Sequence, residues 1–354
     1  MNLYCNEQYL DDIRRTAHIK LPWDKLRNKS IMISGATGLI GSFLIDIILE
    51  KNTNECLNCT IIALGRNEMK ARTRFNNLFN DPRFVFIPYD VKQTLIRNDL
   101  GKIDYILHLA SNTHPLLYSK DPIGTITTNI IGLQNMLEFA VAHNTERFVF
   151  ASSNEMYGEN RGDVELFKED YCGYIDCNTL RAGYPESKRC GEALCQAYKS
   201  QKGLDIIIAR FTRTYGPTML MSDTKAISQF IKNGVDGEDI VLKSSGNQYF
   251  SYTYVADAVS GLLTAFFYGL NGEAYNIADE SGDIYLKDLA KIISDFNDKE
   301  VVYEIPDKIE AAGYSKATKA RLDGSKLKTL GWKPQYDIRS GVKRTISILK
   351  SLNK

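Results

Sequence analysis

Apolar residues gather along this chain into short continuous runs, which are separated by longer stretches with apolar residues at helical spacing. The runs are rich in Ile, Val, Leu and Phe, and they predict strands at 30–35, 60–65, 84–88, 104–110, 147–153 and 205–210. The stretches between them predict helices at 39–51, 67–79, 121–143 and 184–201. Continuous apolar strands that alternate with helices indicate a parallel sheet covered on both faces. We therefore expect an α/β fold with a doubly wound parallel sheet.

The pattern loosens after about residue 215, where short strands separate helices near 224–234, 254–269 and 286–296. This part predicts a smaller, interleaved C-terminal α/β lobe. Before the first strand, apolar residues at helical spacing predict a short helical extension. The expected organisation is an extension at 1–28, a main domain at 29–212 with a returning segment near 240–262, and a second lobe made mainly of 213–354.

The composition is that of an ordinary globular protein, with 44% hydrophobic and 25% charged residues and a formal net charge of +1. No basic stripe is present, which argues against a nucleic-acid partner. No apolar run is long enough to cross a bilayer, and the polar N-terminus lacks the layout of a signal peptide. We therefore expect a cytoplasmic protein without a membrane partner.

Cysteine and histidine usage predicts neither disulfides nor metal. Seven cysteines are too few for a disulfide scaffold in a chain of this length. Cys56 and Cys59 form a lone C-x-x-C pair, which lacks the four ligands of a structural zinc site. The four histidines show no metal-ligand spacing. We expect reduced thiols and no bound metal.

A glycine-rich segment follows the first strand of the main domain and opens the next helix. It is G-x-x-G-x-x-G at residues 35–41. Glycines there permit a tight turn and the close approach of a pyrophosphate, and the helix N-terminus supplies backbone N–H donors. The main domain is therefore expected to be a Rossmann-like dinucleotide-binding domain. The candidate contacts in the loop are Gly35, Thr37, Gly38, Leu39, Ile40 and Gly41.

The end of the second strand bears on the choice of dinucleotide. Sheets that bind NAD usually place an acid there for the ribose 2′-hydroxyl, but this chain has Gly65, Arg66 and Asn67. A missing acid followed by an arginine suits a 2′-phosphate, so NADP(H) is favoured over NAD(H). The alternative is that Arg66 is a solvated loop cation. After the third strand, Asp90 and Val91 are candidates for the adenine edge.

A catalytic constellation is predicted where two later elements meet. The strand at 147–153 ends in Ser152 and Ser153, and a helix then begins with Tyr184 and carries Lys188 four residues on. Residues four apart share one helical face. Lys188 can lower the pKa of the phenol, and Tyr184 can then exchange a proton with a sugar hydroxyl as hydride moves. A serine on the neighbouring strand can hydrogen-bond the same oxygen.

With these residues in place, the chain resembles the extended short-chain dehydrogenase/reductases, which modify nucleotide-activated sugars. The resemblance covers about residues 29–348 and rests on HLAS (108–111), the helix of Asn129, YPESKRCGEALC (184–195), ARFTRTYGP (209–217), SYTYVADAV (251–259), AYNIA (274–278) and GWKPQYD (331–337). The segment at 184–195 and ARFTRTYGP are particularly similar to UDP-glucuronate decarboxylases. The Ser-x-Glu-x-Tyr-Gly run at 153–158 is similar to these enzymes and to sugar 4,6-dehydratases.

The resemblance assigns roles to single residues. It implies that Ser153, Tyr184 and Lys188 form a catalytic triad. Glu155 is implied to be the base or a polar contact near sugar C5. In the HLAS segment, Ala110 and Ser111 are implied to contact the cofactor. A nucleotide sugar as substrate, and a homodimer formed through the helices near 121–143 and 184–201, are implied as well.

Three positions depart from the family pattern. Asn154 stands where dehydratases often carry the Asp that expels the 6-hydroxyl, and an amide cannot donate an acidic proton. Phe250 replaces the usual arginine on the substrate diphosphate, and Arg213 replaces a usual asparagine. We expect all three to line the substrate site, with Arg213 taking over the charge on the diphosphate and Phe250 packing against the nucleotide or sugar. The alternative is that Arg213 pairs with an acid such as Glu155.

These features favour net NADPH-dependent keto-reduction of a nucleotide-linked sugar, because the dehydratase acid is missing and a 2′-phosphate site is inferred. The alternative is a lyase that recycles its cofactor, either a 4,6-dehydratase or a uronate decarboxylase, which Glu155 favours. A 4-epimerase comes third. A non-enzymatic dinucleotide sensor is disfavoured by the intact Ser153, Tyr184 and Lys188.

Overall fold

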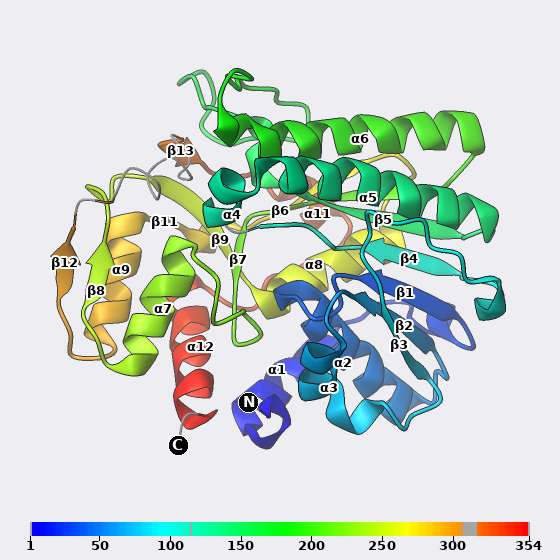
Figure 1. Cartoon of the computed structure of the whole chain (residues 1–354). Coiled ribbons are helices and arrows are strands. Elements are labelled where there is room, and N and C mark those ends of the chain that lie inside the picture. The colour runs from blue at the N-terminus through cyan, green and yellow to red at the C-terminus, as the bar shows by residue number, and fades with distance from the viewer. Residues whose placement is uncertain (1, 114, 305, 307–316, 353–354) are drawn as a thin grey trace.

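The computed structural model describes residues 2–113, 115–304, 306 and 317–352. A seven-stranded sheet in the order β10-β6-β5-β4-β1-β2-β3 runs through it (Figure 1). All its pairings are parallel. Its strands are β1 (Ser30–Ser34), β2 (Thr60–Gly65), β3 (Phe84–Pro88), β4 (Tyr105–His108), β5 (Arg147–Ser153), β6 (Ile206–Phe211) and β10 (Ala274–Ile277).

Helices cover both faces of this sheet, because successive strand residues point to opposite sides. On β1, Ile31 packs in one hydrophobic cluster with Phe43 of α2, whereas Met32 packs in another with Leu133 of α5. The predicted doubly wound α/β fold is therefore confirmed. The flanking helices are α2 (Leu39–Glu55), α3 (Glu68–Phe75), α4 (Pro115–Lys120), α5 (Pro122–Ala142), α6 (Gly183–Lys202) and α8 (Val255–Tyr268).

A smaller lobe is built around a second sheet in the order β11-β9-β13, with β7 also paired to β9, and around the pair β12-β8. Its strands are β7 (Arg213–Tyr215), β8 (Ile240–Leu242), β9 (Tyr249–Tyr254), β11 (Asp283–Tyr285), β12 (Val301–Tyr303) and β13 (Lys319–Ala320). Its helices are α7 (Ala226–Asp236), α9 (Leu286–Asp295), α11 (Ser325–Thr329) and α12 (Ile338–Leu352).

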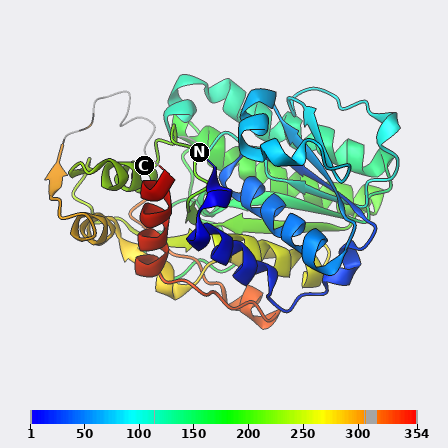
Figure 2. The same ribbon diagram turned by 90° about the horizontal axis from the view of Figure 1, so that it is seen from below.

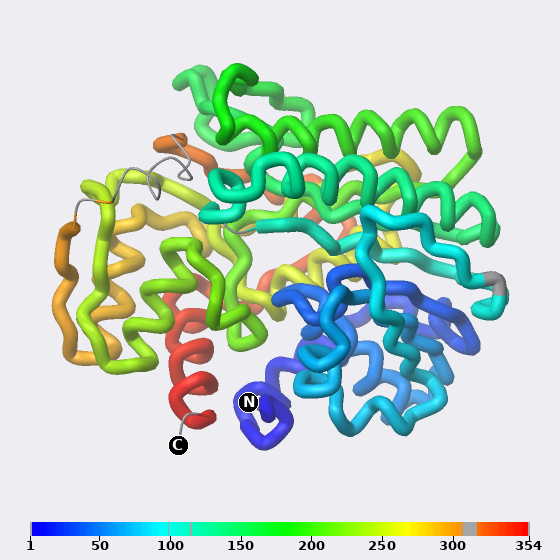
Figure 3. The backbone as a smooth tube through the Cα atoms, viewed as in Figure 1, coloured from blue at the N-terminus to red at the C-terminus, as the bar shows by residue number. Residues whose placement is uncertain are grey.

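The chain passes between the two lobes more than once, as the trace in Figure 3 shows. Of the segment near 240–262, β9 belongs to the small sheet and α8 packs on β6 and β10 of the large sheet. The strand that joins the large sheet beside β6 is β10, which comes after that segment. The lobes are thus interleaved, with α8 and then β10 returning to the large sheet after β9.

The N-terminal extension forms α1 (Glu7–Ala17), flanked by the short turns Leu3–Cys5 and Trp23–Leu26. This helix packs against α2, α8 and α12, and Figure 2 shows it between the two lobes. Its buried Asp12 accepts hydrogen bonds from Tyr254 at 2.5 Å and Tyr336 at 2.7 Å. The extension therefore joins the main domain to the C-terminal helix. Within the described ranges, no helix has the length and apolar character needed to span a membrane.

Candidate active site

A cavity of about 540 Å³ lies where the carboxyl ends of the large-sheet strands face the small lobe. Every cofactor, catalytic and substrate residue proposed from the sequence lines it, except Asn67. The side chain of Asn67 instead accepts a hydrogen bond from the Lys70 backbone N–H at 2.9 Å, which caps α3. The fold thus brings together residues from β1, β2, β5, α6, β7 and β9.

The glycine loop fits a dinucleotide pyrophosphate. Gly35 has a φ of +72°, and a Cβ there would lie 2.9 Å from the backbone of Leu109 and Ala110. A Cβ on Gly41 would lie 2.5 Å from the carbonyl oxygen of Gly35. Helix α2 begins right after Gly38 without a side-chain cap, so its first N–H groups face the cavity and suit an anion.

Two cations and one acid line the cavity beside the ends of β2 and β3. Arg66 and Lys70 both line it beside β2. Burial, and secondarily the charge of Arg66, lower the pKa of Lys70. Asp90 and Val91 lie after β3, where Asp90 is 3.8 Å from the Lys92 ammonium. The end of β2 therefore has the cationic character that the sequence indicated.

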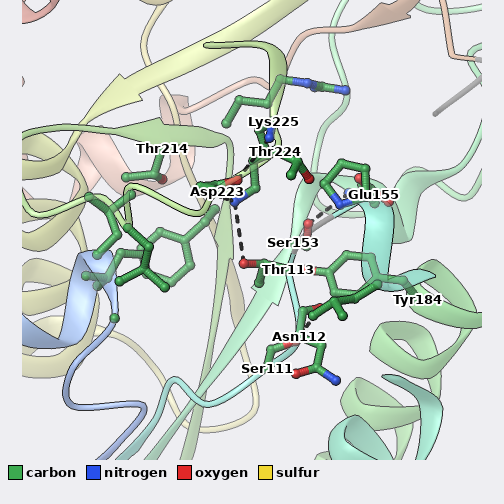
Figure 4. A pocket seen from close by; sticks show the side chains of 18 of the residues that line it. Ser111, Asn112, Thr113, Ser153, Glu155, Tyr184, Thr214, Asp223, Thr224 and Lys225 are labelled. Atoms are coloured by element: carbon green, nitrogen blue, oxygen red, sulfur yellow. Dashed lines mark hydrogen bonds and ion pairs between the residues drawn. The ribbon is translucent and has the colours of Figure 1, made fainter. Parts of the chain in front are cut away.

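Tyr184 and Lys188 both lie on α6 and line the cavity together with the end of β5. Figure 4 shows Tyr184 close to Ser153. The Lys188 ammonium donates to the Ala151 carbonyl at 2.8 Å. Burial lowers the pKa of Lys188 to about 7, against the opposing charge of Glu192. Burial also raises the pKa of Tyr184, although hydrogen bonds with Ser153 and Ser111 act in the lowering direction. The net shift is therefore upward, opposite to the lowering by Lys188 that the sequence analysis expected. The geometry therefore assembles the phenol, the amine and the serine of the predicted triad.

A second layer of contacts holds this group in place. Ser111 donates to the Asn129 side-chain oxygen at 2.7 Å, and the Asn129 amide donates to the Ser187 hydroxyl at 2.8 Å. Tyr118 of α4 stacks on Tyr184 with ring centres 4.7 Å apart. These contacts restrict the rotamers of Ser111 and Tyr184.

Glu155 is ion-paired, and its partner, Arg181, was missed by the sequence analysis. The two side chains meet at 2.6 Å, and the Arg181 guanidinium also lies 4.9 Å from the centre of the Tyr118 ring. Arg181 stands three residues before Tyr184, so helical spacing could have indicated that both face the same cavity. Arg181, Tyr118 and Tyr184 thus lie in successive layers, and Arg181 is ion-paired with the Glu155 carboxylate.

The substrate candidates line the same cavity from both lobes. Asn154 is buried, and its side-chain oxygen lies 3.4 Å from the Ser153 hydroxyl. Arg213 lies over the ring of Phe250. Because Glu155 pairs with Arg181, the alternative in which Arg213 is its ion-pair partner does not describe the observed contacts.

One further contact spans the mouth of the cavity. The Lys225 ammonium lies 2.9 Å from the Asp223 carboxylate and 3.4 Å from the Thr113 hydroxyl (Figure 4). Lys225 precedes α7 of the small lobe, whereas Thr113 follows β4 of the main domain. The two lobes therefore touch across the site through polar side chains, which sequence reasoning did not indicate.

Comparisons with known proteins agree with this architecture. The chain matches the model of the NAD dependent epimerase/dehydratase family over residues 31–278. It is 32% identical over 316 residues to UDP-glucuronic acid decarboxylase 3 of Arabidopsis thaliana, a match that covers 89% of this chain and 87% of that protein. This is a similarity over nearly the full length of both proteins.

Two solved structures show the same fold. The dTDP-glucose 4,6-dehydratase of Streptomyces venezuelae, solved with NAD bound, is 25% identical with a TM-score of 0.78, covering 91% of this chain and 97% of that one. The UDP-glucuronic acid 4-epimerase of Bacillus cereus, in complex with UDP-glucuronic acid and NAD, is 23% identical with a TM-score of 0.78. That match covers 91% of this chain and 99% of the epimerase.

Proposed function

The chain belongs to the NAD dependent epimerase/dehydratase family, and we propose that it is a lyase that decarboxylates a nucleotide-linked uronic acid and recycles its dinucleotide. As a member of this family it is an NAD(P)-dependent enzyme. The observation that carries the proposed reaction is the Glu155–Arg181 ion pair beside Tyr184 and Lys188. The similarity to a UDP-glucuronic acid decarboxylase over 89% of this chain supports it.

The preference for net keto-reduction that the sequence favoured is not retained. It rested on Asn154, which argues against a dehydratase, and on Arg66, which argues for NADP. Neither residue requires that the net reaction be a reduction. The relatives named above are a decarboxylase, a dehydratase and an epimerase, none of which is named as a reductase. These comparisons favour the cofactor-recycling alternative, and Asn154 favours its decarboxylase form because no acid stands there to expel a hydroxyl.

The chemistry of decarboxylation matches the residues of the site. A β-keto acid readily loses its carboxylate as CO₂, because the ketone accepts the electron pair of the bond that breaks. A bound dinucleotide supplies the reversible hydride transfer that creates and later removes such a ketone. Tyr184 takes the hydroxyl proton in one direction and returns it in the other, with Ser153 on the same oxygen. The carbon that loses CO₂ takes a proton from water, and Glu155, held as a carboxylate by Arg181, relays that proton by accepting it from water and passing it on.

The direct test is to incubate the enzyme with UDP-glucuronate and a trace of dinucleotide. We expect CO₂ and a UDP-pentose in equal amounts, with no net change in the dinucleotide, as measured by mass spectrometry and absorbance. UDP-glucose serves as the control, since it has no carboxylate to lose. Consumption of one reduced dinucleotide per sugar, or turnover of UDP-glucose only, would contradict the proposed reaction.

For the cofactor, we propose that NADP is preferred, because Arg66 and Lys70 line the end of β2. Arg66→Ala is expected to weaken NADPH binding by about 1.5–3 kcal/mol, the usual value of a charge-assisted contact, and to leave NADH binding nearly unchanged. Calorimetric titration with both dinucleotides measures this. Lys92→Ala, next to Asp90, is the matched control. Equal losses for both dinucleotides, or a wild type that prefers NADH, would show that Arg66 does not bind a 2′-phosphate.

A homodimer and a cytoplasmic location also remain proposals. The dimer is supported by Ile123, Ile126 and Ile131, which are exposed on α5. A second copy packed against α5 and α6 would cover them. The cytoplasmic location rests on the sequence alone.

A further inference from the structure

Arg213 lies in the cavity without an anionic partner. Its guanidinium carbon is 3.4 Å from the centre of the Phe250 ring, on the neighbouring strand β9. Its Nη1 atom is sealed from solvent and has no hydrogen-bond partner. In the described part of the chain, no carboxylate lies within ion-pair distance of it. Since burial disfavours its charged form and lowers its pKa, the arginine is costly here until an anion meets it.

The positive charge of Arg213 is not balanced by the charged side chains around it. Glu155 and Arg181 both act electrostatically on Arg213, but they are paired with each other, so their charges cancel. Two more buried polar atoms of the same cavity lack partners, the Nε of Arg181 and the hydroxyl of Thr224. Buried polar groups are nearly always satisfied in a working protein. The missing partner is therefore a ligand with oxygen acceptors and a negative charge.

The neighbours of Arg213 indicate which part of that ligand it meets. They include Glu155, Arg181 and Tyr118, and Tyr118 is stacked on Tyr184. Since Tyr184 faces the reacting sugar carbon, Arg213 stands at the sugar end of the cavity, and the diphosphate lies beyond the sugar. We propose that Arg213, braced on Phe250, binds the carboxylate of an acidic sugar and selects it over neutral sugars. This inference rests on the proposed function, and it differs from the sequence-based assignment of Arg213 to the diphosphate.

The stacked geometry suits a carboxylate. A guanidinium that stacks on an aromatic ring keeps its N–H groups in its own plane, parallel to the ring, so their edge stays free to form two parallel hydrogen bonds to one carboxylate. The face of Phe250 adds a cation–π attraction that holds the arginine when no ligand is bound. Phe250 thus has a positioning role, and Arg213 makes the contact.

The test measures binding without turnover, by calorimetry on cofactor-loaded protein in a Tyr184→Phe background. The probes are UDP, UDP-xylose and UDP-glucuronate, of which only the last has a carboxylate. Arg213→Gln is expected to weaken UDP-glucuronate roughly 10- to 100-fold, as loss of a charge-assisted pair does, and to leave the other two unchanged. Arg213→Lys should recover part of the loss. Arg339→Gln, an exposed arginine near the Phe296 ring outside the cavity, should change none of the three.

An equal loss of affinity for all three probes would show that Arg213 binds the diphosphate, and it would overturn the inference. No loss for any probe, or a parent protein that binds UDP-glucuronate no more tightly than UDP-xylose, would also overturn it. Failure of the proposed function looks different: UDP-glucuronate would show the expected dependence on Arg213, yet enzyme with Tyr184 would release no CO₂ from it. The melting temperature of Arg213→Gln shows whether the variant is folded. It should equal or exceed that of the parent protein, because the substitution removes a buried cation whose Nη1 has no hydrogen-bond partner.

Discussion

Tyr184→Phe is expected to bind the dinucleotide as the wild type does and to lose turnover by roughly 10²- to 10⁴-fold, the usual contribution of a positioned acid or base. The substitution removes one hydroxyl and leaves the ring stacked on Tyr118. Lys188 keeps its bond to the Ala151 carbonyl, so the cofactor side of the site is preserved. Without the phenol, nothing at that place takes the sugar hydroxyl proton, and hydride transfer should stop.

Rapid mixing with substrate and oxidised dinucleotide measures this directly. The absorbance of reduced dinucleotide should not rise in Tyr184→Phe, even in a single turnover. Tyr118→Phe is the matched control, since it removes a hydroxyl from the adjacent ring of the same stack and leaves Tyr184 in place. If Tyr184→Phe turned over as fast as this control, Tyr184 would not be the proton-transfer group.

Glu155→Gln is expected to fail at a later step. The proton that replaces CO₂ must come from a group beside the sugar, and an amide cannot supply or relay it. Turnover should fall by roughly 10²-fold or more, while hydride transfer to the dinucleotide still occurs. Reduced dinucleotide should therefore accumulate in a single turnover, opposite to Tyr184→Phe. The neutral side chain also leaves Arg181 without its 2.6 Å partner, so substrate binding should be measured alongside.

Heavy water separates the reaction classes in the same experiment. Wild-type product should contain solvent deuterium on the sugar carbon that lost CO₂, whereas a simple ketone reduction puts none there. Glu186→Gln is the control. Glu186 lies on α6 and, like Glu155, is paired with an arginine: its carboxylate is 3.3 Å from Arg189. If Glu155→Gln turned over as fast as the wild type, Glu155 would have no role in proton transfer. If the wild-type product carried no deuterium at that carbon, the reaction would be a ketone reduction and not a decarboxylation.

The parts of the site that sequence predicted well are local in the chain. The segment at 35–41 forms a tight turn between a strand and a helix, and a Cβ on Gly41 would lie 2.5 Å from the loop's own Gly35 carbonyl oxygen. Tyr184 and Lys188 share a face because helical geometry alone determines where residues four apart point. The fold class followed for the same reason, since alternating apolar runs and helices have few ways to bury both faces of a sheet.

What the sequence pattern left undecided depends on contacts between segments far apart in the chain. Arg181 finds Glu155 across an irregular stretch of 26 residues, for which no periodic pattern predicts a path. Arg213 reaches Phe250 only through the register of β7 on β9, which pairs Arg213 with Tyr252. The sheet edge beside β6 is formed by β10, a short strand whose place in the large sheet no local pattern predicts.

Local structure gives one predicted contact residue another partner. The Asn67 side-chain oxygen accepts a hydrogen bond from the Lys70 N–H and caps α3, because the first N–H groups of a helix have no partner within the helix. The sequence by itself thus determined the fold class, the glycine loop and the Tyr184–Lys188 pair, all of which follow from the backbone geometry of single elements. Tertiary structure alone decided the charge balance of the candidate site, because the side chains of Glu155, Arg181 and Arg213 come from three separate segments that only packing brings together.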